Sequence, residues 1–160
     1  MHIRPSTAGD HDDIWRIFHA VVRTGDTYAF DPDISRSDAI AAWCASGVHT
    51  YVAEDDGQVV GTYILKANQP GLGSHVANAA FMVDPETQGK GVGRTMAEHC
   101  LDEARGLGFK AMQFNLVVAQ NKPAVALWEK LGFETVGRLR GAFRHRADGL
   151  VDALVMYRVL

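Results

Sequence analysis

The glycine-rich stretch MVDPETQGKGVGR, residues 82–94, combines residue types and a spacing that indicate chemistry. Within it an apolar segment ends, a polar turn follows and a helical pattern begins. The backbone N–H groups of a first helical turn have no partner within the helix, and the helix dipole favours an anion beside them. Gly89, Gly91 and Gly93 have no side chain, so a bulky phosphate can approach these amides closely. The stretch therefore predicts a cradle for a diphosphate.

Other side chains of this turn also favour an anion. Gln88 offers a side-chain amide, and Lys90 and Arg94 are positively charged. The P-loop pattern GxxxxGK[ST] is excluded because Gly91 follows Lys90, and the Rossmann pattern GxGxxG because its third glycine is misplaced. What remains is Gln-x-x-Gly-x-Gly, ending at Gly93. A glycine-rich loop that binds nothing is the alternative interpretation.

The segments around this turn must hold it in place, and their hydrophobic periodicity predicts what they are. Strands are expected over residues 3–6, 50–54, 59–66, 75–83, 111–118, 135–139 and 151–160. Helices are expected over residues 10–25, 36–45 with Ser35 as cap, 94–107 and 123–131. A loop holding Arg144, His145 and Arg146 is expected between the last two strands. This order predicts one mixed α/β sheet with helices on its faces.

Composition limits the function classes. A chain of 160 residues with 47% hydrophobic and 22% charged residues is typical of one globular domain, and a net charge of -3 gives no general attraction to nucleic acid. Cys44 and Cys100 match no metal-ligand spacing, so we expect two free thiols in a reducing compartment and no metal. There is no secretory signal and no apolar run of about 20 residues. We therefore expect a soluble, cytoplasmic protein without a membrane or nucleic-acid partner.

The Gln-x-x-Gly-x-Gly pattern after a Val-Asp-Pro strand end resembles the pyrophosphate loop of the GNAT superfamily of acetyl-CoA-dependent N-acetyltransferases. The segment NKPAVALWEKLGF, residues 121–133, resembles that family's Asn-x-x-Ala-x-x-Leu-Tyr-x-x-x-Gly-Phe helix, and the order of elements resembles the family along nearly the whole chain. The resemblance implies a GNAT-like, splayed mixed sheet flanked by helices, a single N-acetyltransferase domain over residues 1–160, acetyl-CoA as cosubstrate and a homodimer. Phe143, His145 and Asp152 further resemble the phosphinothricin-acetyltransferase-like branch.

The resemblance also implies which residues hold the cofactor. The strand end at Phe81–Val83 would be splayed from residues 111–118 and would pair with the pantetheine arm as an added strand would. A backbone N–H near Met82 or Val83 would polarise the thioester carbonyl. The residues expected to bind the cofactor are Phe81, Met82, Val83, Gln88, Gly89, Lys90, Gly91, Val92, Gly93, Arg94, Asn121 and Trp128.

The sequence departs from the family at the catalytic groups. Trp128 stands where the family has its tyrosine acid, and an indole N–H is a hydrogen-bond donor but not a usable acid. Packing against the cofactor or core is the expected role of Trp128. Amine acetylation also needs a neutral amine and so a general base, yet the strands where the family carries a carboxylate have Asn78 and Asn115 instead. His75 and His145 are the candidate bases, and Asn78 is a further candidate catalytic residue. The alternative for each histidine, and the commoner role of a histidine, is that of a surface residue or a satisfied core residue. Either the thiolate leaves without an acid, or another group replaces the tyrosine, for which Tyr28, Tyr63 and Tyr157 are the candidates.

The acceptor amine is expected near residues 27–33, where the family places substrate contacts. Tyr28 and Phe30 would hold an apolar portion, and Asp31 or Asp33 an ammonium group, with Asn115 as a further contact. A solvated loop is the alternative for this segment. The leading hypothesis is N-acetylation of a small-molecule amine or amino acid. Acetylation of a protein N-terminus or lysine, which needs an open groove, and a non-catalytic acyl-CoA-binding module are the alternatives.

Overall fold

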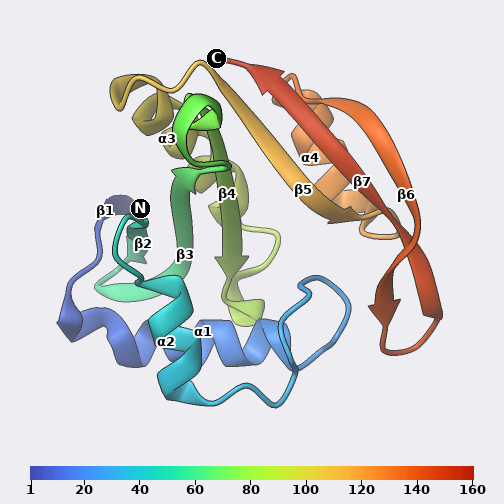
Figure 1. Cartoon of the computed structure of the whole chain (residues 1–160). Coiled ribbons are helices and arrows are strands. Elements are labelled where there is room, and N and C mark those ends of the chain that lie inside the picture. The colour runs from blue at the N-terminus through green and yellow to red at the C-terminus, as the bar shows by residue number, and fades with distance from the viewer.

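A computed structural model describes all residues 1–160 and contains a seven-stranded sheet in the order β1-β2-β3-β4-β5-β7-β6 (Figure 1). The strands are β1 His2–Pro5, β2 His49–Asp55, β3 Gln58–Ala67, β4 Val76–Val83, β5 Ala111–Val118, β6 Glu134–His145 and β7 Gly149–Val159. The α-helices are α1 His11–Val22, α2 Arg36–Trp43, α3 Val92–Gly106 and α4 Lys122–Lys130. Short 3-10 turns occupy η1 Ala8–Asp10, η2 Gly71–Gly73 and η3 Pro85–Thr87. The mixed α/β fold expected from the sequence is confirmed.

Capping and turn residues in the sequence predicted the ends of most helices and strands to within a few residues. The Ser35 hydroxyl caps α2 by accepting a hydrogen bond from the Asp38 amide (3.1 Å). Asp56 and Gly57 turn the β2–β3 hairpin with positive φ angles of 49° and 78°. The third helix begins at Val92, two residues before the predicted start at Arg94.

The expected loop at residues 144–146 is wrong in its extent. Arg144 and His145 belong to β6, where they pair with Leu150 and Gly149, and only residues 146–148 form the turn. The register shifts between Leu139 and Phe143, and this irregularity breaks the alternation that marks a strand. The sequence pattern therefore ends at residue 139 although the strand continues.

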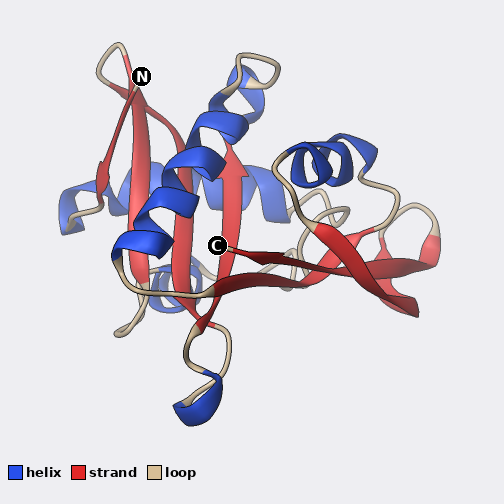
Figure 2. Ribbon diagram, turned by 90° about the horizontal axis from the view of Figure 1, so that it is seen from above, coloured by secondary structure: helices blue, strands red, loops and turns tan.

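β4 and β5 lie side by side only at their beginnings. The two strands are parallel and pair at Val76 with Ala111 and at Ala77 with Met112, and no further. Beyond these pairs they diverge, so that β5, β7 and β6 turn away from the first four strands (Figure 2). We call the opening between β4 and β5 beyond Ala77 and Met112 the gap. It leaves one edge of β4 without a strand partner.

Helices cover both faces of the sheet, with α1 and α2 on one face and α3 and α4 on the other. The larger core cluster lies under α3 and α4 and includes Tyr63, Met96 and Phe114. The smaller one lies under α1 and α2 and includes Ile14 and Met82. Successive side chains of a strand point to opposite faces. The two sides of the gap are therefore lined by different sets of residues.

Buried polar contacts fix α3 on the sheet. The Tyr51 hydroxyl donates to Glu103 Oε2 (2.7 Å), and the Tyr63 hydroxyl is bonded to His99 Nδ1 (2.7 Å). The contacts join β2 and β3 to the middle and the end of α3, and so hold that helix on the sheet. None of the helices is long and apolar enough to cross a bilayer.

Candidate active site

The glycine-rich turn presents bare backbone amides at the start of α3. Thr95 is the first residue of α3 whose amide makes a helical hydrogen bond, and it donates to Gly91 O (3.0 Å). The amides of Val92, Gly93 and Arg94 make no hydrogen bond within the chain. Gly91 is the N-cap with φ 81°, and a Cβ added there would meet nothing within 4 Å. The site therefore combines a helix N-terminus with open space for an anion.

An ion pair beneath this turn fixes its position. Asp84 follows β4, is buried, and accepts a hydrogen bond from the Glu86 amide (3.0 Å). The guanidinium of Arg16 in α1 pairs with the Asp84 carboxylate and also donates to Val59 O (2.8 Å). Burial alone would raise the pKa of Asp84, but Arg16 and the Glu86 amide outweigh it and leave the pKa lowered. Asp84 is thus an ionised anchor for the turn.

Two cations flank the amides. Arg94 pairs with Glu98 one turn along α3 (2.8 Å) and also lines a hollow of about 320 Å³ between α3 and α4. Lys130 of α4 lines the same hollow. Sequence reasoning did not single out Lys130, although its place in the last turn of the helix that starts at Asn121 could have drawn attention to it. Lys90 is exposed.

The free edge of β4 faces the gap through its odd-numbered residues. Asp84 donates its amide to Val60 O of β3 (2.9 Å), whereas His75 O accepts from Lys110 on the β5 side (2.8 Å). Because residues of an antiparallel pair alternate in the edge they face, even-numbered residues bond to β3 and odd-numbered ones face the gap. The residues whose backbone groups face the gap without a strand partner are Ala79, Phe81 and Val83. Met82 turns its N–H to β3, which corrects the expectation that this amide serves the thioester.

Tyr28, from the loop after α1, occupies the middle of this free edge. Its hydroxyl donates to Phe81 O and accepts from Phe81 N (3.0 Å). Burial raises the pKa of Tyr28 to about 12, so the hydroxyl keeps its proton at neutral pH. A side chain 53 positions away in the sequence thus takes the place that an added strand would take.

Aromatic rings form the wall of the gap on the α4 side. Trp128 lies 5.2 Å from Phe81 and 4.6 Å from Phe114 between ring centroids, and Phe133 stacks on Phe114 at 4.5 Å. The indole N–H of Trp128 makes no hydrogen bond within the chain and is not sealed from solvent. Asn121 caps α4 by accepting from the Ala124 amide (3.3 Å) and also lines the gap. Trp128 is therefore a packed wall residue that keeps a free donor.

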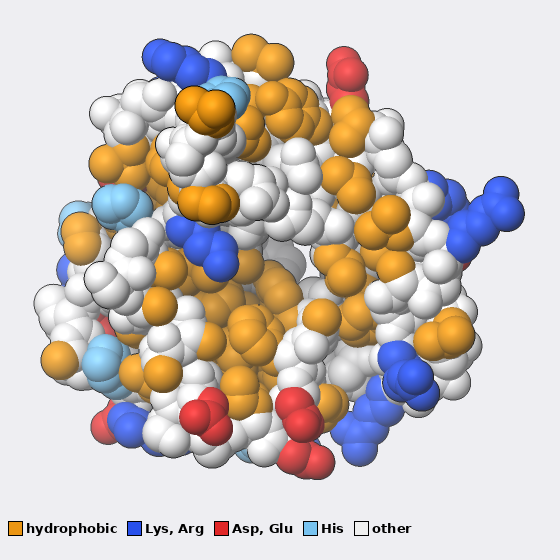
Figure 3. Space-filling model, in the orientation of Figure 1, with side chains coloured by type: hydrophobic (Ala, Val, Ile, Leu, Met, Phe, Trp, Pro, Cys, Tyr) orange, Lys and Arg blue, Asp and Glu red, His pale blue; other side chains and the backbone are white.

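A cavity of about 570 Å³ fills the gap, and most of its lining is hydrophobic. The face drawn in Figure 3 is hollowed near its centre, and hydrophobic side chains gather there. Tyr28, Phe81 and Trp128 line this cavity, and so do Asn78 and Asn115 on the side of α1 and α2. One half-open cavity thus joins the free strand edge to the expected acceptor contacts.

A second cavity, of about 940 Å³, lies between the loop after α1 and the β6–β7 hairpin. Tyr28 and Phe30 line both cavities, whereas Asp31 and His145 line only this outer one. The Asp31 carboxylate accepts from the Asp33 amide (2.9 Å). His145 Nδ1 accepts from the amides of residues 147 and 148 (both 3.2 Å), which leaves Nε2 as its free nitrogen.

Comparison with known proteins identifies the family. Residues 12–133 match the family model described as acetyltransferase (GNAT) family. A solved GCN5-related N-acetyltransferase from Kribbella flavida has this fold with a TM-score of 0.95 and 41% identity, covering 99% of this chain and 97% of its own.

The chain belongs to the acetyltransferase (GNAT) family.

Curated relatives agree with this membership. The N-acetyltransferase aca1 of Schizosaccharomyces pombe is 40% identical over 98 residues, 61% of this chain and 47% of its own length. The [ribosomal protein bS18]-alanine N-acetyltransferase of Escherichia coli is 38% identical over 74 residues, 46% of this chain and 49% of its own. The chain thus spans about half the length of these relatives. The resemblance to the family and the acyltransferase class expected from the sequence are confirmed.

Several residues considered for the chemistry of this GNAT protein lie away from the gap. His75 is exposed at the paired beginning of β4 and lines none of the cavities described above. Tyr63 is engaged with His99 under α3, and Tyr157 lies in β7 outside the cavity. Of the three tyrosines considered as acids, Tyr28 is the one in the gap.

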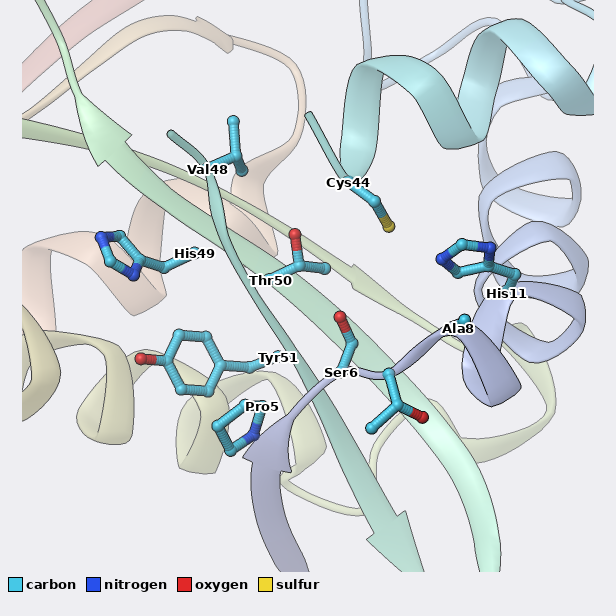
Figure 4. Close-up of a pocket in the computed structure, with 10 residues that line it drawn as sticks. Pro5, Ser6, Ala8, His11, Cys44, Val48, His49, Thr50 and Tyr51 are labelled. Carbon is cyan, nitrogen blue, oxygen red and sulfur yellow. The ribbon is translucent and has the colours of Figure 1, made fainter. Parts of the chain in front are cut away.

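A further hollow of about 420 Å³ lies on the other flank of the GNAT fold, between η1, the end of α2 and β2 (Figure 4). The side chains of Cys44 and His11 point toward one another across it, while His49 points away. Burial raises the pKa of the Cys44 thiol, so this cysteine is not an activated nucleophile. No group of three or more His, Cys, Asp or Glu side chains in the chain is arranged to hold a metal ion.

Proposed function

We propose that this GNAT protein transfers the acetyl group of acetyl-CoA to the amine of a small molecule or amino acid. The observation that carries the proposal is that the free β4 edge borders a half-open, mostly apolar cavity and leads directly into the turn with the free α3 amides. Bound acetyl-CoA would supply the acetyl group as an activated thioester. The residues of the chain then have three tasks: to hold the carrier, to provide protons and to admit the acceptor.

The carrier fits the residues present. The unpaired amides of Val92, Gly93 and Arg94, with Lys90 and the side chain of Gln88 beside them, can neutralise a diphosphate. The glycine at 91 leaves room for it. Pantetheine is long and carries amides, so it suits the backbone groups of Ala79 and Val83 and the free amide of Asn121.

Tyr28 is proposed as the proton donor that Trp128 cannot be. Its neutral hydroxyl is hydrogen-bonded to the backbone of Phe81 at the gap. Acetyl-CoA would have to displace this hydroxyl in order to pair with the free edge of β4. Once displaced, the hydroxyl would lie near the strand edge where the thioester is expected, and it could give its proton to the leaving thiolate. The Phe81 amide that it vacates, or that of Val83, can then bind the thioester carbonyl.

The proposed base is His145, reached from the outer cavity. Its Nε2 is the nitrogen free to accept a proton, because its Nδ1 is held by the turn amides. Asn78 and Asn115 line the gap where the family resemblance implied a carboxylate, and they are proposed to orient the acceptor. Tyr28 and Phe30, shared by both cavities, would hold its apolar part.

A contact between two distant segments supports a small acceptor. The Arg146 amide donates to Gly25 O (2.9 Å), and the Arg146 guanidinium donates to Arg23 O (2.7 Å). These bonds join the β6–β7 hairpin to the loop after α1. A Cβ on Gly25 would lie 2.9 Å from Arg146 Cβ, so the approach depends on glycine. The joined segments close one side of the acceptor cleft, which an extended peptide would need open.

Acetylation of a protein terminus or lysine is the second candidate, because two relatives are named for protein acceptors. One is the ribosomal-protein alanine acetyltransferase, and the other a peptidyl-lysine N-acetyltransferase of Salmonella typhimurium, 36% identical over 59 residues. The Gly25–Arg146 contact disfavours this candidate.

A cytoplasmic location and a homodimer complete the proposal. Four exposed large hydrophobic residues lie on the last two strands, and β6 is the edge strand of the sheet. They are Val136, Leu139, Leu150 and Val159. Sedimentation of the purified protein tests the dimer, and a single monomeric species would contradict it.

Thiol release from acetyl-CoA in the presence of amines tests the proposed function. We expect release that depends on small amines, with the acetylated amine found by mass spectrometry. Turnover restricted to peptides would favour the second candidate. Binding of acetyl-CoA without turnover of any amine would instead indicate a non-catalytic acyl-CoA-binding module.

A further inference from the structure

The side of the gap that looks toward α1 and α2 carries polar side chains. Even-numbered residues of β3 and β4 point to this side, as Ile64 and Met82 do in the core beneath α1. Lys66 and Asn78 follow the same alternation and lie opposite each other in the register of the two strands. Asn115 reaches the same cavity from β5, so an ammonium group and two amides meet there.

Hydrogen bonds tie the amides together and leave the ammonium group free. Asn78 Nδ2 donates to Gln113 O (2.9 Å), Gln113 Nε2 to Asn115 Oδ1 (2.9 Å), and Asn115 Nδ2 to Asn68 Oδ1 (2.7 Å). Lys66 takes part in no salt bridge. Each amide thus has a hydrogen-bond partner, which for Asn78 is the backbone of β5, whereas the lysine has none.

No Asp or Glu lines this cavity, and Lys66 is its one formally charged side chain. An unpaired positive charge attracts an anion and disfavours a second ammonium group nearby. We propose that Lys66 binds a carboxylate of the acceptor, and so selects amines that also carry an acid group. This inference rests on the proposed function and assigns its acceptor a chemical class.

The same charge arrangement explains how the amine can react without a carboxylate base. A protonated amine would meet no negative side chain in the gap, so the site offers nothing to hold the unreactive form. Asp31 and Asp33, which the sequence suggested as partners of an ammonium group, line the outer cavity. They would therefore hold the protonated amine there and not in the gap. Lys66 therefore acts as a specificity-determining residue and takes no part in the transfer itself.

The outer cavity supplies a matched control. Arg144 lines it, is exposed like Lys66, and takes part in no salt bridge. There it lies among Asp31 and Asp33 and two further arginines, Arg23 and Arg146, so its removal leaves other charged side chains in that cavity. Lys66→Met and Arg144→Met each remove one exposed cation, but only the first removes the cation of the gap.

The test is steady-state kinetics with the twenty amino acids and their carboxamides, compared at equal concentrations of neutral amine. For the best amino acid we expect Lys66→Met to raise KM about 10- to 100-fold, the loss typical of a charge-assisted bond. KM for the matching carboxamide, kcat and KM for acetyl-CoA should change less than about twofold. Lys66→Arg should recover most of the lost affinity, and thermal melts check that all variants fold.

A binding measurement separates this inference from the proposed function because it needs no turnover. The coenzyme A complex is titrated with N-acetylated amino acids and with their carboxamides. Binding of the acids alone, lost in Lys66→Met and kept in Arg144→Met, supports the inference even if no amine is turned over. Equal binding of acids and carboxamides, or loss of selectivity in Arg144→Met instead, would overturn it.

Discussion

The two sides of the gap are built in different ways. What we call the carrier side, because we propose that it binds acetyl-CoA, consists of backbone groups: the amides at the start of α3 and the edge of β4, with Gly91 keeping them accessible. What we call the acceptor side, because we propose that it binds the amine, consists of side chains from segments far apart in the sequence, with Tyr28, Lys66 and Asn115 lining one cavity. Backbone groups serve any chain that adopts this fold, whereas side chains can change without disturbing it. The comparison explains how one family can keep a carrier and vary its acceptors.

Tyr28 belongs to the acceptor side, but its hydroxyl is hydrogen-bonded to Phe81 on the carrier side. Removing this hydroxyl therefore tests whether the two sides act separately. We expect Tyr28→Phe to lower kcat about 100-fold, because the proton donor is lost. Affinity for acetyl-CoA should stay the same or rise, since the Phe81 edge is freed. The control is Tyr63→Phe, which removes a hydroxyl bonded to His99 away from the gap. Equal kcat values for the two variants would remove Tyr28 from the mechanism.

Substitution of Gly91 tests the carrier side alone. Gly91→Ala forces an L side chain into a positive-φ conformation beside the free amides, and we expect acetyl-CoA binding to weaken about tenfold. Gly57→Ala introduces the same kind of strain (φ 78°) in the β2–β3 turn, far from the amides. Calorimetric titration should show normal affinity for this control. A Gly91→Ala protein with unchanged affinity would contradict the role given to these amides.

The histidines test the outer cavity. His145→Ala should lower kcat/KM about fivefold at neutral pH, because a base near the reaction is lost. His75→Ala should leave kcat/KM unchanged, since His75 lies outside the cavities of the site. Wild-type kcat/KM in both variants would mean that neither histidine is the base.

The smallest expected effect concerns the anchor below the glycine-rich turn. The pKa of Asp84 is lowered in the folded protein, so its stabilisation is present above about pH 4 and is lost as pH falls through the folded value. Urea unfolding should show Asp84→Asn less stable by about 1–2 kcal/mol at pH 7, with the difference shrinking toward pH 2.5. Asp56→Asn, at an exposed turn without a salt bridge, is the control. A constant difference across this pH range would contradict the ion-pair account.

Local signals made the fold and the carrier side predictable. Ser35 as a cap, the Asp56-Gly57 turn and the glycines at 89 and 91 each act through their own backbone or a near neighbour. The strand that continues past Leu139 was missed because a shift in register interrupts its alternation. Such features depend on neighbours in the sequence, so they can be predicted to within a few residues, as the start of α3 at Val92 in place of Arg94 illustrates.

The acceptor side could not be predicted in the same way. The bond from Tyr28 to Phe81 and the unpaired charge of Lys66 exist only once distant segments are folded together. Sequence reasoning named Tyr28 and Asn115 through a family resemblance, but it could not choose among three tyrosines, and it overlooked Lys66. A sequence does not state to which face of the sheet a side chain points or which other residues line the same cavity. Both are properties of the folded chain.

Calorimetric titration of the wild-type protein with coenzyme A and with pantetheine tests the central claim most directly, because pantetheine lacks the diphosphate and the adenosine 3′-phosphate attached to it. If the bare amides at the start of α3 hold that diphosphate, coenzyme A should bind at least about 100-fold more tightly than pantetheine. Equal affinities, or no heat with coenzyme A, would contradict the account.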